Sequence, residues 1–194
     1  MRIEVKKLNV QEYRGTELIF EYVTTGYYDL TVNGLSYTFE YKKFDKPVQK
    51  RFTDQIASDW LDAPILYGAY MGERQVGLLE LNEETWNKRL RITNILVEQE
   101  YRSRGIGRIL LEKAIEVAGE MQDRMVILET QSCNEAAIAC YRKAGFQLIG
   151  FDTCCYSNDD LKKHEMRLEF GRRVQHEKAH SLFVWENSAE DKTD

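Results

Sequence analysis

The sequence predicts a single α/β domain built on a mixed β-sheet, and three observations carry this prediction. The first third of the chain is rich in strand patterns and contains a strong hairpin signal. In the middle, an apolar strand, a short glycine-containing loop and an amphipathic helix lead into a second apolar strand, which implies parallel neighbours joined by a right-handed crossover. A second helix and two more strands follow, so antiparallel hairpins should flank the parallel pair.

Apolar runs that are bounded by turn residues predict the strands of this sheet. In chain order they span residues 1–5, 18–23, 28–32, 35–41, 65–71, 76–81, 90–97, 125–129, 146–151 and 165–170. Asn33-Gly34, between two of these strands, is typical of a two-residue hairpin turn.

Helices are predicted from caps and from the spacing of apolar residues. Thr53 fits the N-cap of a short helix over residues 56–61. Residues 106–118 carry an apolar face at helical spacing. A third helix should begin at Ser132-x-x-Glu135, which resembles a capping box, and stop at Gly145.

Composition restricts the class of protein. A length of 194 residues suits one domain, and 43% hydrophobic with 30% charged residues indicates a globular chain. The apolar runs are far shorter than the ~20 residues that cross a bilayer, and residues 1–5 lack the apolar core of a signal peptide, so we expect a cytoplasmic protein without a membrane partner. The net charge of −5 and the lack of a basic stripe argue against nucleic acid and are compatible with a cationic substrate.

The loop Arg102-Ser103-Arg104-Gly105-Ile106-Gly107-Arg108 carries the most chemical information. It joins a strand to a helix start, where backbone N–H groups and the helix dipole favour a phosphate. Its two glycines remove Cβ atoms where a ligand would approach the backbone. A Rossmann fingerprint would need a third glycine at the position of Leu110, and a P-loop would need Lys in place of Arg108, so both of these classes are disfavoured.

Two linked motifs give the loop a family resemblance. Arg102-x-x-Gly105-x-Gly107 resembles the pyrophosphate-binding signature of the GNAT N-acetyltransferase superfamily, and Asn134, Tyr141 and Gly145-Phe146 follow in the order of its second coenzyme A motif. The resemblance spans residues 66–170. It implies the GNAT fold, a mixed, mostly antiparallel sheet with flanking helices and a V-shaped split between the family's fourth and fifth strands.

The resemblance also divides the chain and assigns the cosubstrate. Residues 1–60 would be the β-rich N-terminal part of the same domain with acceptor-side elements, residues 61–172 the acetyl-CoA-binding core, and residues 173–194 a C-terminal extension. Acetyl-CoA would be the cosubstrate, with no metal. Backbone groups of Ile95-Leu96-Val97 would hold the pantetheine arm and the thioester carbonyl, and residues 102–108 would surround the pyrophosphate.

The remaining site residues each keep two interpretations. In the family, Asn134 contacts the cofactor and Tyr141 protonates the departing thiolate, whereas the alternatives are a helix cap and a core aromatic residue. The acceptor amine, whose pKa is about 10.4 in a lysine-like molecule, needs a base or a water chain leading to one. Glu80 and Glu129 are the candidates, with Glu98 as a further one, and each is also compatible with a structural carboxylate.

A narrower resemblance concerns the acceptor. Residues 128–131, Asn134, residues 149–153 and Tyr156 look like streptothricin acetyltransferases. That group often carries an acidic pair on its fourth strand, where this chain has Thr93-Asn94, so the base and the acceptor stay open. The tyrosines and phenylalanines of residues 27–41 are candidates for the acceptor pocket.

We therefore expect a cytoplasmic GNAT N-acetyltransferase that acetylates a primary amine of a small molecule, with streptothricin-type antibiotics, and hence antibiotic resistance, as the first hypothesis. Another amine (a polyamine, an amino acid, a protein N-terminus or a lysine) and a non-catalytic acetyl-CoA sensor are the alternatives. His176-Glu177-Lys178-Ala179-His180 matches the zinc-binding pattern HExxH, which we interpret as a coincidence because little chain remains for a third ligand. The family also permits a homodimer, for which residues 181–185 are one candidate surface.

Overall fold

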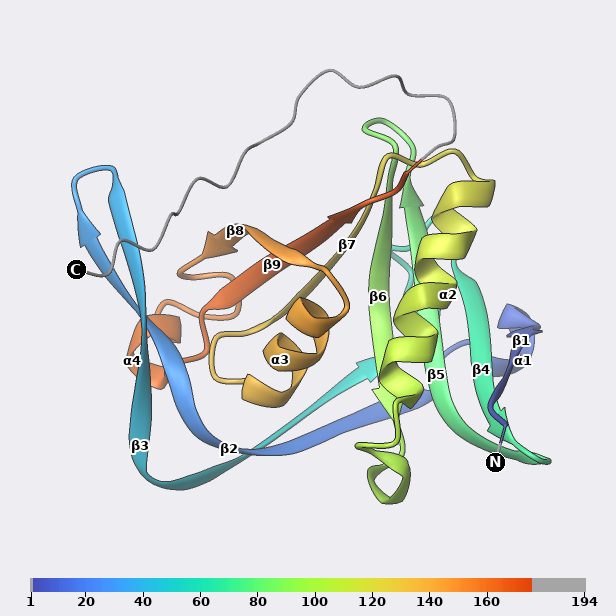
Figure 1. The fold of residues 1–194 in the computed structure, drawn as a ribbon, viewed down its shortest axis with the longest axis horizontal. Coiled ribbons are helices and arrows are strands. Elements are labelled where there is room, and N and C mark those ends of the chain that lie inside the picture. The colour runs from blue at the N-terminus through green and yellow to red at the C-terminus, as the bar shows by residue number, and fades with distance from the viewer. Residues whose placement is uncertain (1, 176–194) are drawn as a thin grey trace, which may run out of the picture.

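The computed structural model describes residues 2–175, which form a seven-stranded sheet, a two-stranded hairpin and the helices that pack on them (Figure 1). The order of the main sheet is β1-β4-β5-β6-β7-β9-β8. Its strands are β1 (Glu4–Leu8), β4 (Ile65–Met71), β5 (Arg74–Glu84), β6 (Arg89–Val97), β7 (Met125–Gln131), β8 (Gln147–Asp152) and β9 (Arg167–Arg173). β6 and β7 run parallel and the other neighbours antiparallel, so the predicted mixed, mostly antiparallel sheet is confirmed.

The sheet splits between its two parallel strands. β6 and β7 pair only over Arg89–Arg91 and Met125–Ile127, although both strands continue for several residues beyond this point. Past the paired residues the strands diverge, which is the predicted V-shaped opening. The edge of β6 that faces the opening therefore has no strand partner for its backbone groups.

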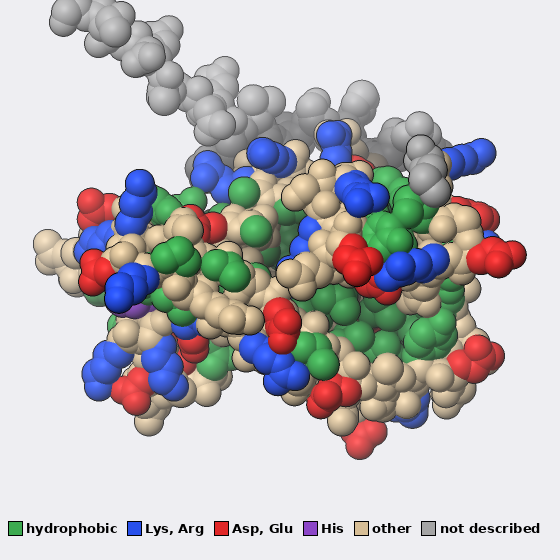
Figure 2. Space-filling view, turned by 90° about the horizontal axis from the view of Figure 1, so that it is seen from below, with side chains coloured by type: hydrophobic (Ala, Val, Ile, Leu, Met, Phe, Trp, Pro, Cys, Tyr) green, Lys and Arg blue, Asp and Glu red, His purple; other side chains and the backbone are tan. Residues whose placement is uncertain are grey.

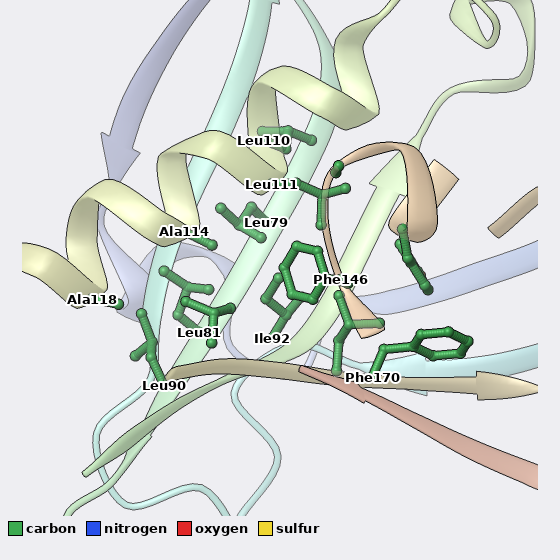
Figure 3. Packing of buried hydrophobic residues seen from close by; sticks show 14 of the residues in the cluster. Leu79, Leu81, Leu90, Ile92, Leu110, Leu111, Ala114, Ala118, Phe146 and Phe170 are labelled. Atoms are coloured by element: carbon green, nitrogen blue, oxygen red, sulfur yellow. The ribbon is translucent and has the colours of Figure 1, made fainter. Parts of the chain in front are cut away.

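The helix α2 (Ile106–Glu120) covers one face of the central strands. Its buried residues Leu110 and Ala114 pack in one cluster with Leu79 and Leu81 of β5 and Ile92 of β6 (Figure 3). The helix α3 (Glu135–Lys143) adds further buried residues to the same cluster. Both predicted amphipathic helices are confirmed, because each buries its apolar face against the sheet.

The hairpin consists of β2 (Glu17–Asn33) and β3 (Ser36–Gln55), each longer than the separate strands that the sequence predicted. Asn33 pairs with Ser36, so the turn residues are Gly34 and Leu35 and not Asn33-Gly34. The pairing register shifts between Thr24, which pairs with Val48, and Gly26, which pairs with Lys43. In Figure 1 the hairpin crosses the open end of the split sheet, from the side of β1 and α1 (Val10–Tyr13) to that of α4 (Asp160–Lys163).

The short helix predicted over residues 56–61 is wrong. The strand β3 continues through Thr53, and the chain then turns at the base of the hairpin. The Ile56 N–H donates to the Thr16 carbonyl at 3.0 Å, and the Gly15 N–H donates to the Ile56 carbonyl at 2.8 Å. These long-range bonds and the burial of Ile56 outweigh the local helical preference.

The capping box predicted at the start of the third helix is also wrong, although the helix itself forms. The N-cap is Asn134, whose side-chain oxygen accepts from the Ala137 N–H at 3.2 Å. Ser132 instead donates its hydroxyl to the His164 carbonyl at 3.0 Å. The expected stop at Gly145 is confirmed, and this glycine has the left-handed φ of 82° that suits a helix end.

On the face shown in Figure 2, hydrophobic side chains gather in a hollow, and acidic and basic side chains are interspersed around it. Among residues 2–175 no helix is both long and apolar enough to cross a membrane. The segments His176–His180 and 181–185 of the expected C-terminal extension lie outside the described residues.

Candidate functional site

A cleft of about 610 Å³ lies where β6 and β7 diverge. Its walls are formed by β6, the loop after it, β7 and α3 on one side, and by the β2–β3 hairpin on the other. Seven of the predicted site residues line this cleft: Ile95, Leu96, Val97, Arg102, Glu129, Asn134 and Tyr141. The fold thus brings together residues that are up to 46 positions apart in the chain.

The β6 edge presents backbone donors to the cleft. The Glu98 N–H donates to the Val76 carbonyl on the β5 side at 3.0 Å. Because N–H groups point to alternate edges along a strand, those of Ile95 and Val97 point to the opposite edge, toward the split. The Val97 carbonyl, which accepts from Nε of Arg102 at 3.1 Å, points the same way. This edge can donate hydrogen bonds to an acyl carbonyl and an amide chain.

Arg102 is the residue of the basic loop that lines the cleft. Its guanidinium donates to the carbonyls of Val97 at 3.1 Å and Glu21 at 2.7 Å, and it forms no ion pair with any residue of the described chain. Arg104 stacks on the Tyr101 ring at 5.2 Å, and Arg108 is exposed on α2. The loop therefore offers one positioned cation at the cleft and further positive charge beside it.

The two loop glycines differ in what requires them. Gly105 has a φ of 83°, in the left-handed region that favours glycine. Ser103, two residues earlier, also has a positive φ, of 61°. A Cβ at Gly107 would meet only the Cys140 Sγ, at an ordinary 3.6 Å. Packing within the protein therefore leaves space above Gly107 at the start of α2, where the side chain of Ile106 is buried in the core. A pyrophosphate fits this donor set and this space.

Tyr141 on α3 combines a packed ring with an available hydroxyl. The ring contacts Phe146 and Phe170 at centroid distances of 6.4 and 6.0 Å. The hydroxyl forms no hydrogen bond to any protein group in residues 2–175, and burial, with the nearby Cys140 and Glu129, raises the pKa of Tyr141 above its ordinary value of 10.0. The phenol is thus protonated at neutral pH and able to donate a proton.

Glu80 lies directly beneath the cleft. Its side chain is fully buried and accepts from the Ala57 N–H at 2.6 Å, the Thr93 hydroxyl at 2.7 Å and the Asn94 amide at 2.8 Å. The register shift between Glu80 and Leu81 leaves Thr93 as an extra residue on β6, a β-bulge. The bulge explains how two consecutive strand residues reach one carboxylate while both also line the cleft.

The other carboxylate candidates are paired. Glu129 lines the cleft but forms an ion pair with Nε of Arg167 at 2.7 Å, and the Tyr156 hydroxyl lies 3.5 Å from it. Glu98 pairs with Arg74 at 2.8 Å and does not line the cleft. Glu80 is thus the candidate that forms no ion pair within residues 2–175, and Thr93 and Asn94, which donate to it, both line the cleft.

The hairpin wall contains residues that the sequence did not single out. Phe20 and Phe52, stacked at 4.9 Å, line the cleft together with Tyr22 and Asp54. The aromatic segment 27–41 lies elsewhere, and two of its residues line a separate cavity of about 340 Å³. Asp54 has no local sequence signal of its own, and it directly follows Thr53, where the sequence wrongly predicted the start of a helix.

Asn134 satisfies both interpretations proposed for it, since it caps α3 and also lines the cleft. Its side-chain oxygen is used in the cap, and its amide nitrogen has no hydrogen-bond partner in the described chain, so it can donate to a ligand. Within residues 2–175 no group of three or more His, Cys, Asp or Glu residues is placed to hold a metal ion.

Comparisons with known proteins agree with this geometry. The model of the acetyltransferase (GNAT) family matches residues 35–146. The chain is 34% identical to streptothricin acetyltransferase A of Bacillus subtilis over 131 residues, which are 65% of this chain and 73% of that protein.

Two solved structures share the architecture. A nourseothricin acetyltransferase superimposes with a TM-score of 0.74 at 26% identity, covering 89% of this chain and 99% of that one. A Bacillus anthracis protein solved with acetyl coenzyme A has a TM-score of 0.70 at 20% identity, covering 90% and 99% of the two chains, and shows the fold alone. With a family model that matches more than half of its length and a split sheet of the same fold, the chain belongs to the GNAT acetyltransferase family.

Proposed function

We propose that this acetyltransferase transfers the acetyl group of acetyl-CoA to a primary amine of a small cationic molecule, with a streptothricin-type antibiotic as the acceptor. One observation carries the proposal: a single cleft joins an unpaired cation, the open edge of β6 and the protonated hydroxyl of Tyr141. The similarity to streptothricin and nourseothricin acetyltransferases supports the acceptor class.

The wall formed by β6, the loop after it, β7 and α3, together with the start of α2, would hold acetyl-CoA. The N–H groups at the start of α2 and the Arg102 guanidinium would bind the pyrophosphate, because both supply positive charge to one place. Backbone groups of Ile95 and Val97 would bind the pantetheine arm and the thioester carbonyl, and the Asn134 amide would donate to the same ligand. A donor aimed at the oxygen of a tetrahedral intermediate is worth roughly 3 kcal/mol.

Acetyl-CoA supplies an activated acyl group, and the chain's own residues would manage two protons. Tyr141 would protonate the thiolate that leaves when the C–S bond breaks. The reacting ammonium would pass a proton to the Thr93 hydroxyl oxygen while Thr93 passes its own proton to Glu80, which is 2.7 Å away. The neutral amine then forms the C–N bond, and the second proton that its nitrogen loses returns to the Tyr141 phenolate, so that the net release is one proton through Glu80. Glu129, neutralised by Arg167, suits the positioning of the acceptor better than proton removal.

A thiol-release assay tests the proposal. Purified protein is incubated with acetyl-CoA and, in turn, a streptothricin, polyamines, amino acids and peptides. Thiol released at the highest kcat/KM with the streptothricin supports the proposal, and preferred turnover of another amine moves the acceptor to that class. Tight binding of acetyl-CoA without turnover of any amine would identify a sensor and contradict the proposal.

A further inference from the structure

Four charged residues line the cleft, and two of them are already neutralised. Glu21 pairs with Nε of Arg51 at 2.9 Å, and Glu129 pairs with Nε of Arg167 at 2.7 Å. Arg102 and Asp54 form no ion pair with any residue in positions 2–175. The cleft thus carries one unpaired cation, on the proposed cofactor wall, and one unpaired anion, on the hairpin wall.

The position of Asp54 turns its side chain toward the sheet. It lies opposite Leu18 in the hairpin register, and opposite residues of an antiparallel pair share a face. Leu18 packs in a cluster with Leu78 of β5 and Leu96 of β6, so this face of the hairpin covers the central strands. The one protein hydrogen bond of the half-buried Asp54 carboxylate within the described chain comes from the adjacent Gln55 N–H, at 2.7 Å.

A carboxylate in this place would bind the acceptor but would hinder the reaction if it held the reacting amine. A nearby negative charge stabilises the ammonium form and raises its pKa, which opposes the proton loss that must precede attack. The same charge binds a second, non-reacting ammonium at no cost to the chemistry. Because Asp54 is half-buried, such a contact is screened less than one on the open surface.

We propose that Asp54 binds a second ammonium group of the acceptor and so selects small molecules with two or more amines. The inference rests on the proposed function and deepens it, since it specifies the charge pattern of the acceptor. One ammonium is held at Asp54, and another amine loses its proton and is acetylated beside the open edge of β6.

The variant Asp54→Asn tests this inference, with Asp59→Asn as the matched control, because Asp59 is an exposed carboxylate of the same region outside the cleft. With a streptothricin as acceptor, Asp54→Asn should raise the acceptor KM about tenfold, the loss of one charge-assisted bond. The kcat and the KM for acetyl-CoA should stay within about twofold, Asp54→Glu should restore part of the acceptor affinity, and Asp59→Asn should match the parent protein.

A second readout uses inhibition of that reaction by 1,5-diaminopentane and by pentylamine, which differ in one ammonium. The parent protein should bind the diamine about tenfold more tightly, and Asp54→Asn should lose this preference. An active, folded Asp54→Asn protein with an unchanged acceptor KM and an unchanged diamine preference overturns the inference alone. A parent protein that releases no thiol with any amine overturns the proposed function instead.

Discussion

The two walls of the cleft differ in how they are joined to the rest of the molecule. The wall of β6, α2, β7 and α3 is built from elements that follow one another in the chain and bury their apolar faces in one core. The hairpin wall instead packs Leu18 into a separate, smaller apolar cluster and is also joined by polar contacts between distant segments, as where Arg102 donates to the Glu21 carbonyl and Tyr22 donates to Gln131. Changes in the first wall should therefore alter acetyl-CoA binding and chemistry, whereas changes in the hairpin should alter the acceptor.

The largest effect should come from the proposed acid on the first wall. Tyr141→Phe keeps the packed ring and removes the proton donor, so kcat should fall about a hundredfold while the Kd for acetyl-CoA holds. Steady-state kinetics and calorimetric titration measure the two quantities, and Tyr70→Phe, outside the cleft, is the control. An unchanged kcat would remove Tyr141 from the mechanism. Another residue of this wall would then have to protonate the leaving thiolate.

A smaller loss is expected where β6 meets the acceptor. Thr93→Val removes the hydroxyl between the cleft and Glu80, and kcat/KM should fall by roughly tenfold or more, most strongly at low pH, where few acceptor amines are neutral. Thr93→Ser keeps the hydroxyl and should keep the pH profile. If Thr93→Val and Thr93→Ser lose activity equally at every pH, the bulge serves only as structure.

The two glycines of the loop separate ligand binding from folding within the first wall. Gly107→Ala adds an ordinary contact on a helix, so the melting temperature should hold or rise, whereas the Kd for acetyl-CoA should increase about tenfold as the methyl group occupies the space above the helix start. Gly105→Ala, at a φ of 83°, should cost about 1 kcal/mol of unfolding free energy. Calorimetry with and without acetyl-CoA measures both. If Gly107→Ala binds acetyl-CoA as tightly as the parent protein does, the pyrophosphate must bind elsewhere.

The smallest effect concerns the attachment of the hairpin to α3. Burial alone would raise the pKa of Glu135, but hydrogen bonds from Thr24, Tyr41, Thr25 and Gly26 outweigh it and lower the pKa to about 2. A lowered folded-state pKa stabilises the fold above the unfolded value of 4.5, and this stabilisation is lost as the pH falls toward 2. Glu135→Gln should cost about 1 kcal/mol at pH 7, after allowance for solvent screening.

Thermal unfolding from pH 7 to pH 2 checks this prediction. The melting temperatures of the parent protein and Glu135→Gln should converge below pH 4.5. A gap that stays constant over this range would show that the charge of Glu135 does not hold the hairpin. The acceptor KM of Glu135→Gln should rise more than its KM for acetyl-CoA, if the two walls respond separately.

The accuracy of the sequence predictions follows the same division. The strand, loop and helix around Gly105 were predicted because neighbouring residues carry the signals, namely an apolar run, glycines and a helical period. The helix expected after Thr53 does not form because Ile56 donates a hydrogen bond to Thr16 and accepts one from Gly15. The capping box failed because Glu135 bonds to the hairpin, more than 90 residues away in the chain.

The sequence by itself determined the family, the loop that suits a pyrophosphate, and the choice of Asn134 and Tyr141 as candidate site residues. These depend on short-range spacing. Only the tertiary structure decided that Glu80 lies under the cleft, that Glu129 is neutralised by Arg167 and that Asp54 forms no ion pair within residues 2–175. Charge pairing depends on which distant side chains meet, and no local pattern records that. The proposed cofactor wall was thus predictable from local motifs, and the residues that would choose the acceptor were not.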